Sequence, residues 1–136
     1  TGLLKELFEK KIIPQNIPTL GICLGMQFIA GYYGATVDKV VNPIHGSQVE
    51  IEHSNDILFK DIPNKFKAVR YNSLGITDVS LNENLEYIAF EKETGSIMAL
   101  KHSSLPFVGL QYHPESFLSE NGEETVNNFL EIYVEN

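Results

Sequence analysis

The sequence predicts an α/β domain, and three observations carry this prediction. The opening of the chain alternates helical and strand-like patterns, the middle consists of short apolar stretches between turn-forming residues, and the end has the periodicity of an amphipathic helix. The chain has 136 residues, of which 43% are hydrophobic and 21% are charged. This size and composition are typical of one globular domain. We therefore expect a single domain over residues 1–136.

The opening residues are predicted to form a helix, a strand, a tight turn and a second helix. Leu4, Leu7 and Phe8 have the spacing of one helical face, and Pro14 is expected to end that helix. The apolar run 17–22 is typical of a buried strand. A second helix is predicted by four residues that repeat the helical spacing: Met26, Ile29, Ala30 and Tyr33. This order of elements is typical of a parallel α/β sheet.

The middle of the chain, from Thr36 to Leu100, is predicted to contain strands joined by hairpin-like turns. Its short apolar stretches are separated by clusters of Asn, Asp, Pro and Gly, and include 37–41, 49–51, 68–71 and 97–100. A further strand is expected over 105–112 and leads directly to His113. The last helix is predicted by four residues with helical spacing: Val126, Phe129, Leu130 and Tyr133.

The charge balance excludes several classes of partner. The chain has 10 Lys and Arg residues against 18 Asp and Glu residues, a formal net charge of −8. Such a surface repels phosphate backbones and anionic lipids, so we expect no nucleic-acid and no membrane partner. No apolar run approaches the ~20 residues that cross a bilayer. A single cysteine cannot form an internal disulfide, which is typical of a cytoplasmic protein.

The sharpest motif surrounds this single cysteine. Cys23 lies between a predicted strand and a predicted helix, with Gly21 two residues before it and Gly25 two residues after it. This spacing is typical of a nucleophile elbow, in which side chains at the flanking positions would collide as the strand turns back into the helix. The positive end of the following helix favours a thiolate at this position. A lone cysteine is more often a small core residue, but the two glycines favour a nucleophile.

A second pair of residues supplies a base and a group to orient it. His113 and Glu115 are two residues apart at the end of a predicted strand, so both side chains can point to the same side. A cysteine nucleophile needs such a base, and the base needs an orienting partner. Cys23, His113 and Glu115 are therefore the candidate catalytic residues.

The remaining histidines do not indicate a metal site. His45, His53 and His102 have no metal-ligand spacing to one another or to Cys23. We expect them to be turn or surface residues, and we expect neither a metal nor a cofactor.

The motifs resemble those of a known family. The stretches 21–27 (GICLGMQ) and 111–116 (QYHPES) are similar to the two signatures of class I, triad-type glutamine amidotransferases. Three further stretches, His45-Gly46, 70–74 (RYNSL) and 115–122 (ESFLSENG), resemble the subfamily that serves chorismate-using synthases. That subfamily comprises the small subunits (component II) of anthranilate synthase and aminodeoxychorismate synthase.

The resemblance implies a fold. Members of this family have an α/β, flavodoxin-like fold with an open mixed, mostly parallel sheet flanked by helices. It implies that 1–136 is an amidotransferase domain that is N-terminally incomplete, without the first strands. It also places one oxyanion donor in a Gly-Pro-Gly loop upstream of the helix that opens this chain.

The resemblance also implies a reaction and its partners. Cys23 would attack the side-chain amide of L-glutamine, His113 would move the proton and Glu115 would orient the imidazole. The products would be glutamate and ammonia, formed through a thioester, and the ammonia would pass to a chorismate-binding synthase large subunit (component I). The backbone N–H of Leu24 would be an oxyanion donor.

The resemblance implies three contacts to the bound glutamine, namely Gln27, Ser73 and Leu74. From the residue types alone, these would be a helix-surface glutamine, a turn serine and a core leucine.

Three alternatives to this function remain open. The chain could be the amidotransferase domain of another synthase, such as one of purine or pyrimidine synthesis. It could be a cysteine hydrolase with an α/β-hydrolase-like fold, although there the acid normally precedes the histidine. It could also be an inactive truncated remnant that only binds a partner.

Overall fold

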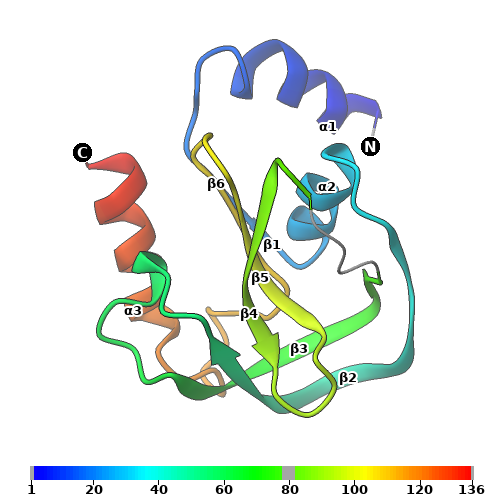
Figure 1. Ribbon diagram of the computed structural model, residues 1–136, viewed down its shortest axis with the longest axis vertical. Coiled ribbons are helices and arrows are strands. Elements are labelled where there is room, and N and C mark those ends of the chain that lie inside the picture. Colours follow the sequence, from blue (N-terminus) through cyan, green and yellow to red (C-terminus); the bar gives the residue numbers. More distant parts are fainter. Residues whose placement is uncertain (1, 78–81, 136) are drawn as a thin grey trace.

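The computed structural model describes residues 2–77 and 82–135, except for the side chains of residues 40–46, 72 and 73. The strands of these residues form one sheet in the order β1-β6-β5-β4-β2-β3 (Figure 1). Their bounds are β1 Thr19–Ile22, β2 Val37–His53, β3 Lys65–Ile76, β4 Leu85–Glu91, β5 Ile97–His102 and β6 Phe107–Leu110.

The helices confirm the three helical predictions. The first, α1 (Gly2–Leu7), continues into a π-helical turn that ends at Ile12, before Pro14. The second, α2 (Leu24–Tyr32), follows β1, and the third, α3 (Gly122–Phe129), continues into a π-helical turn near the end of the chain. A short 3-10 turn, Ile57–Phe59, joins β2 to β3. None of the helices in the described ranges has the length and apolar character needed to cross a membrane.

The sheet is mixed, as expected, but its strand directions differ from the expectation. Among the described strands only β1 and β6 are parallel, and the other four neighbouring pairs are antiparallel. The expectation of a mostly parallel sheet is therefore wrong for these residues, because turns and short loops join β2 to β6 in sequence. Antiparallel strands accept such short connections, whereas parallel strands need a crossover. The α/β class itself is confirmed.

The middle of the chain forms longer strands than its apolar stretches suggest. The separate stretches 37–41 and 49–51 belong to the single strand β2, which pairs with β3 along most of its length. The register between β2 and β3 shifts between Lys39 and Ile44 and again between His45 and Ser47. Such irregularities bend a strand and increase its twist.

Two hydrophobic clusters lie on the two faces of the sheet. Phe107 of β6 packs into the cluster that contains Phe8 and residues of α2. Its neighbour Val108 packs into the other cluster, which contains Phe129 of α3. This alternation is the two-residue period of a strand buried on both faces. Figure 1 accordingly shows α1 and α2 together and α3 apart from them.

The sheet curls so that its two ends meet. β1 and β3 stand at opposite ends of the strand order, yet the Cys23 sulfur, directly after β1, lies 3.8 Å from the backbone oxygen of Tyr71 in β3. Similarly, the backbone N–H of His113, three residues after β6, donates to Val69 of β3 at 2.9 Å. We call this junction between β3 and the ends of β1 and β6 the seam. The residues that the sequence singled out gather at the seam.

Candidate active site

Cys23 occupies a strained turn between β1 and α2. Its backbone has φ 56° and ψ −103°, a conformation that L-residues rarely adopt. Its N–H donates to Leu110 of β6 at 2.7 Å, and its carbonyl accepts from the N–H of Gln27 at 3.1 Å. One bond therefore ties the turn to the sheet and the other to the first turn of the helix. The predicted elbow geometry is confirmed.

The two glycines beside Cys23 play different roles. A Cβ on Gly21 would lie 2.6 Å from the backbone carbon of Gly25, which is closer than real Cβ contacts allow. A Cβ on Gly25 would meet nothing within 4 Å. The predicted collision is thus confirmed at Gly21 and wrong at Gly25. The turn brings the backbone of Gly25 over Gly21, while the Cβ direction of Gly25 points away from that contact.

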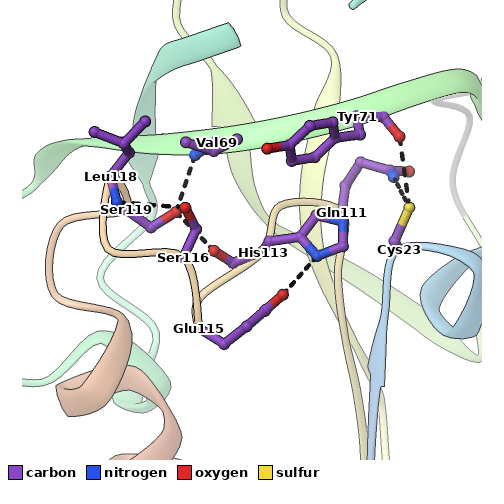
Figure 2. Close-up of polar contacts among 9 residues, drawn as sticks. All are labelled: Cys23, Val69, Tyr71, Gln111, His113, Glu115, Ser116, Leu118 and Ser119. Atoms are coloured by element: carbon purple, nitrogen blue, oxygen red, sulfur yellow. Dashed lines mark hydrogen bonds and ion pairs between the residues drawn. The ribbon is translucent and has the colours of Figure 1, made fainter. Parts of the chain in front are cut away.

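The sulfur of Cys23 has two polar neighbours at the seam. The side-chain Nε2 of Gln111 donates to the sulfur at 3.5 Å, and the thiol can donate to the backbone oxygen of Tyr71 at 3.8 Å (Figure 2). Gln111 is 0% exposed, whereas Cys23 is half-buried.

Two of the three residues expected to contact glutamine lie together beside Cys23. The Nε2 of Gln27 donates both to the backbone oxygen of Leu74 at 2.9 Å and to Oε1 of Gln111 at 3.0 Å. Gln27 is buried, so it is not the helix-surface residue that its type alone suggested. The side chain of Ser73 lies outside the described part of the chain.

The expected oxyanion donor lies at the start of α2. Leu24 is the first residue of this helix and follows Cys23 directly. A backbone N–H at the first helical position has no acceptor within its own helix. The side chain of Leu24 is largely exposed. This N–H therefore lies at the positive end of the helix dipole, in the residue that follows Cys23.

The predicted pair of His113 and Glu115 is formed. The Nδ1 of His113 lies 2.8 Å from Oε2 of Glu115, and the side chains are 26% and 66% exposed. The imidazole also meets the ring of Tyr71 edge to face, with centroids 5.3 Å apart. Tyr71 thus contacts Cys23 through its backbone and His113 through its ring (Figure 2). This residue joins the two parts of the candidate triad.

The loop after His113 is held by short hydrogen bonds. The hydroxyl of Ser119 donates to the backbone oxygen of His113 at 2.6 Å and accepts from the N–H of Val69 at 2.9 Å (Figure 2). A Cβ on Gly122 would lie 1.8 Å from the carbonyl oxygen of Pro114, so the start of α3 packs directly on this loop. The backbone of His113 is therefore fixed to β3 and to α3.

Residues 111–113 alternate between the seam and the core. Gln111 contacts Cys23 and His113 contacts Tyr71, whereas Tyr112 between them is fully buried against Phe66 with ring centroids 5.7 Å apart. Burial raises the pKa of Tyr112 well above its usual range. This side chain anchors the segment and leaves its two neighbours facing the seam.

Three residues that shape the site were not predicted from the sequence: Gln111, Tyr71 and Ser119. The two-residue spacing between Gln111 and His113 was an available signal, since both follow the same strand. Arg70, beside Tyr71, forms an ion pair with Glu91 at 3.0 Å, and both side chains are almost fully buried. This pair links β3 to β4, so the arginine of the RYNSL stretch has a structural partner.

The expectation for the other histidines is wrong where they are described. His53 and His102 are only 5% and 7% exposed. His53 stacks on Phe59, and its Nε2 lies 3.1 Å from the backbone oxygen of Ile62. Backbone partners satisfy these rings inside the core, which is why a polar residue type misled the prediction. The side chain of His45 lies outside the described part, and within that part no group of three His, Cys, Asp or Glu residues could hold a metal ion.

Comparison with known proteins identifies the family. The class-I glutamine amidotransferase family model matches residues 4–132. Anthranilate synthase component 2 of Azospirillum brasilense is 42% identical over 114 residues, which are 84% of this chain and 58% of that protein. Aminodeoxychorismate/anthranilate synthase component 2 of Bacillus subtilis is 39% identical over 118 residues, 87% of this chain and 60% of that protein. The chain thus spans about three-fifths of the length of these relatives.

A solved structure gives the same result for the fold. A protein from Thermoplasma acidophilum that is provisionally assigned to GMP synthase superposes with a TM-score of 0.84 at 27% identity. The match covers 97% of this chain and 66% of that one. The family match extends over nearly the whole chain and the relatives are about 40% identical. This chain belongs to the class-I glutamine amidotransferase family.

Proposed function

We propose that this chain carries the glutaminase activity of an amidotransferase and hydrolyses L-glutamine through Cys23, His113 and Glu115. One observation supports this proposal above the others. The cysteine elbow and the His113–Glu115 pair, which are distant in sequence, meet the same residue, Tyr71, at the seam. A nucleophile, a base and an orienting carboxylate are the three groups that covalent acyl transfer requires.

The proposed reaction proceeds through a thioester. Glu115 accepts a hydrogen bond from Nδ1–H of His113, which leaves Nε2 to take the thiol proton. The sulfur of Cys23 attacks the side-chain amide carbon of glutamine, and the N–H of Leu24 stabilises the resulting oxyanion. His113 returns its proton to the leaving nitrogen, which departs as ammonia. Water then attacks the γ-glutamyl thioester and releases glutamate.

The hydrogen bonds of Gln27 define how it would contact the substrate. Both hydrogens of its amide nitrogen have acceptors within the protein, at Leu74 and Gln111. Its remaining polar atom is the carbonyl oxygen, which can only accept. Gln27 would therefore bind an N–H of glutamine, with Ser73 and Leu74 as the further proposed contacts.

Labelling with a glutamine analogue tests the glutaminase proposal. In 6-diazo-5-oxo-norleucine a diazoketone replaces the amide, and a cysteine nucleophile forms a carbon–sulfur bond as nitrogen gas leaves. We expect one adduct by intact mass, located on Cys23 by peptide mapping and absent from Cys23→Ala. Excess L-glutamine should slow the labelling. A folded chain that forms no adduct would contradict a competent glutamine site and would favour a remnant that only binds a partner.

We further propose that the ammonia serves a chorismate-using synthase, the large subunit (component I) of anthranilate or 4-amino-4-deoxychorismate synthesis. The names of the two curated relatives support this partner. Mixed with chorismate and such a large subunit, the chain should support product formation from glutamine. Product that forms from free ammonium salts but not from glutamine would contradict the pairing.

A second candidate is the amidotransferase part of a different synthase. The resemblance to the protein assigned to GMP synthase favours it, at 27% identity against about 40% for the component 2 relatives. Purification from the native source distinguishes the two, because the synthase that accompanies the chain would be a chorismate-using or a nucleotide-using enzyme.

A further inference from the structure

Gln111 is a fully buried polar side chain that contacts the candidate nucleophile. It follows β6, and its backbone N–H still donates to Met98 of β5 at 2.8 Å. Its side chain lies between Gln27 on one side and Cys23 on the other. Burying an amide without partners is costly, so its two hydrogen bonds define the orientation in which it is stable.

A backbone carbonyl determines that orientation. The carbonyl oxygen of Leu74 can only accept, so the atom of Gln27 that faces it at 2.9 Å must be the amide nitrogen. The same nitrogen faces Gln111 at 3.0 Å, so the facing atom of Gln111 must be its oxygen. The nitrogen of Gln111 is then the atom at 3.5 Å from the sulfur. The chain of bonds from β3 through α2 thus directs an N–H toward Cys23.

The sulfur lies between two groups with opposite preferences. The backbone oxygen of Tyr71, at 3.8 Å, accepts from a thiol and repels a thiolate. The N–H of Gln111 stabilises a thiolate, because a hydrogen bond to a charged group is stronger than one to a neutral group. Gln111 is fully buried, which strengthens its interaction with the sulfur. Without the Gln111 donor, the backbone oxygen of Tyr71 would remain beside the sulfur, and this oxygen favours the neutral thiol.

We propose that Gln111 is a positioning residue that holds the sulfur of Cys23 and stabilises its thiolate, with its own amide oriented by Leu74 through Gln27. The inference rests on the proposed function only in taking Cys23 as the nucleophile. It assigns Gln111 no contact with glutamine. Its effect is therefore measurable without substrate and without a synthase.

The single cysteine makes a direct test possible. Iodoacetamide forms a carbon–sulfur bond with a thiolate and releases iodide, and here it can report only on Cys23. The rate is measured from pH 5 to pH 10 for the parent chain and for Gln111→Met, which keeps the unbranched shape and removes both polar groups. Gln111→Leu is a second variant, and Gln15→Met and Gln15→Leu are matched controls at an exposed position. Circular dichroism and urea unfolding show which variants are folded.

The proposal predicts that the pH–rate profile of alkylation moves along the pH axis while its maximum rate stays the same. The midpoint of the pH–rate profile should move up by about one pH unit in the Gln111 variants, which makes alkylation about tenfold slower at pH values below both midpoints. The rates should converge at pH values above both midpoints, and the Gln15 controls should follow the parent chain. A midpoint within about 0.2 pH unit of the parent in a folded Gln111 variant overturns the proposal. A lower plateau with an unmoved midpoint also overturns it, since that pattern indicates altered access to the sulfur.

This result is independent of labelling by the glutamine analogue. A displaced midpoint in a chain that does not react with 6-diazo-5-oxo-norleucine would retain the role of Gln111 and contradict the glutaminase proposal. An unmoved midpoint in a chain that does react would retain the glutaminase proposal and contradict the role of Gln111.

Discussion

The candidate active site has two parts, which are held in different ways. The nucleophile part consists of Cys23, Gln27 and Gln111, and both glutamines are buried and bonded to each other. The base part consists of His113 and Glu115, whose carboxylate is largely exposed. Buried hydrogen bonds and the close backbone contact at Gly21 hold the first part. The second part has an exposed carboxylate on a loop that the Ser119 bonds and the packing of Gly122 hold in place.

Because of this difference, some substitutions at the site should affect mainly the stability of the fold and others mainly catalysis. Changes in the nucleophile part disturb packed atoms and should cost folding free energy. Changes to the exposed carboxylate of the base part alter a surface charge, so the catalytic geometry can be lost while the fold remains, whereas the Ser119 bonds that hold its loop contribute to stability. The following predictions test this separation, beginning with the largest expected effect.

The largest effect is expected at the glycine beneath the elbow. Gly21→Ala places a Cβ against the backbone of Gly25, which cannot move without opening the turn at Cys23. We expect the free energy of unfolding to fall by about 3 kcal/mol in urea unfolding. Gly25→Ala is the matched control, because its Cβ meets nothing and alanine favours a helix by up to about 1 kcal/mol. Equal stability of the two variants would contradict the steric account of the elbow.

The second effect concerns activity without stability. Glu115→Gln keeps the shape of the side chain but removes the charge that orients His113. We expect glutamine hydrolysis to slow about a hundredfold, as for other losses in acid–base catalysis. The free energy of unfolding should stay within about 0.5 kcal/mol, because exposed ion pairs contribute little. A stability loss as large as that of Gly21→Ala would contradict the contrast between the two parts.

The third effect is expected in the loop that carries His113. Ser119→Ala leaves the N–H of Val69 and the carbonyl of His113 without their hydroxyl partner. We expect unfolding free energy to fall by about 2 kcal/mol. Ser103→Ala removes a single exposed bond to Glu83 and should cost less than about 0.5 kcal/mol. If both variants unfold alike, the loop is not held as described.

The smallest effect is expected at the buried histidine His102. Burial lowers the pKa of His102, and its Nδ1 accepts from the N–H groups of Ser104 and Leu105 at 3.1 and 2.9 Å. The unfolded chain therefore binds the proton more readily, and stability should fall as the pH drops below about 6.5. His102→Asn keeps an acceptor that does not titrate, so its unfolding free energy should fall less between pH 7.5 and pH 5.5. Equal losses in the two chains would contradict this origin of the acid sensitivity.

Local patterns predicted the parts of the site that depend on neighbouring residues. The spacing of Gly21 and Cys23 predicted the elbow, and the spacing of His113 and Glu115 predicted their bond. Helical periodicity predicted α1, α2 and α3. These features depend on residues close in sequence, where backbone geometry is decisive.

The curl of the sheet could not be predicted from such local patterns. Tyr71 reaches Cys23 because β3 closes against the ends of β1 and β6, which are distant from it in the strand order. The role of Gln111 was not predicted, because its partners Gln27 and Cys23 come from another part of the sequence. The burial of His102 was missed because Tyr33, whose ring packs against its imidazole, comes from another part of the sequence.

The central claim is that Cys23 and the His113–Glu115 pair act together on the amide of glutamine. The most direct test is to mix the chain with L-glutamine, quench with acid within seconds and measure the intact mass. The account predicts a γ-glutamyl thioester on Cys23 that Cys23→Ala does not form and that Glu115→Gln forms more slowly. A thioester that forms equally fast in Glu115→Gln, or glutamine hydrolysis that survives in Cys23→Ala, would contradict it.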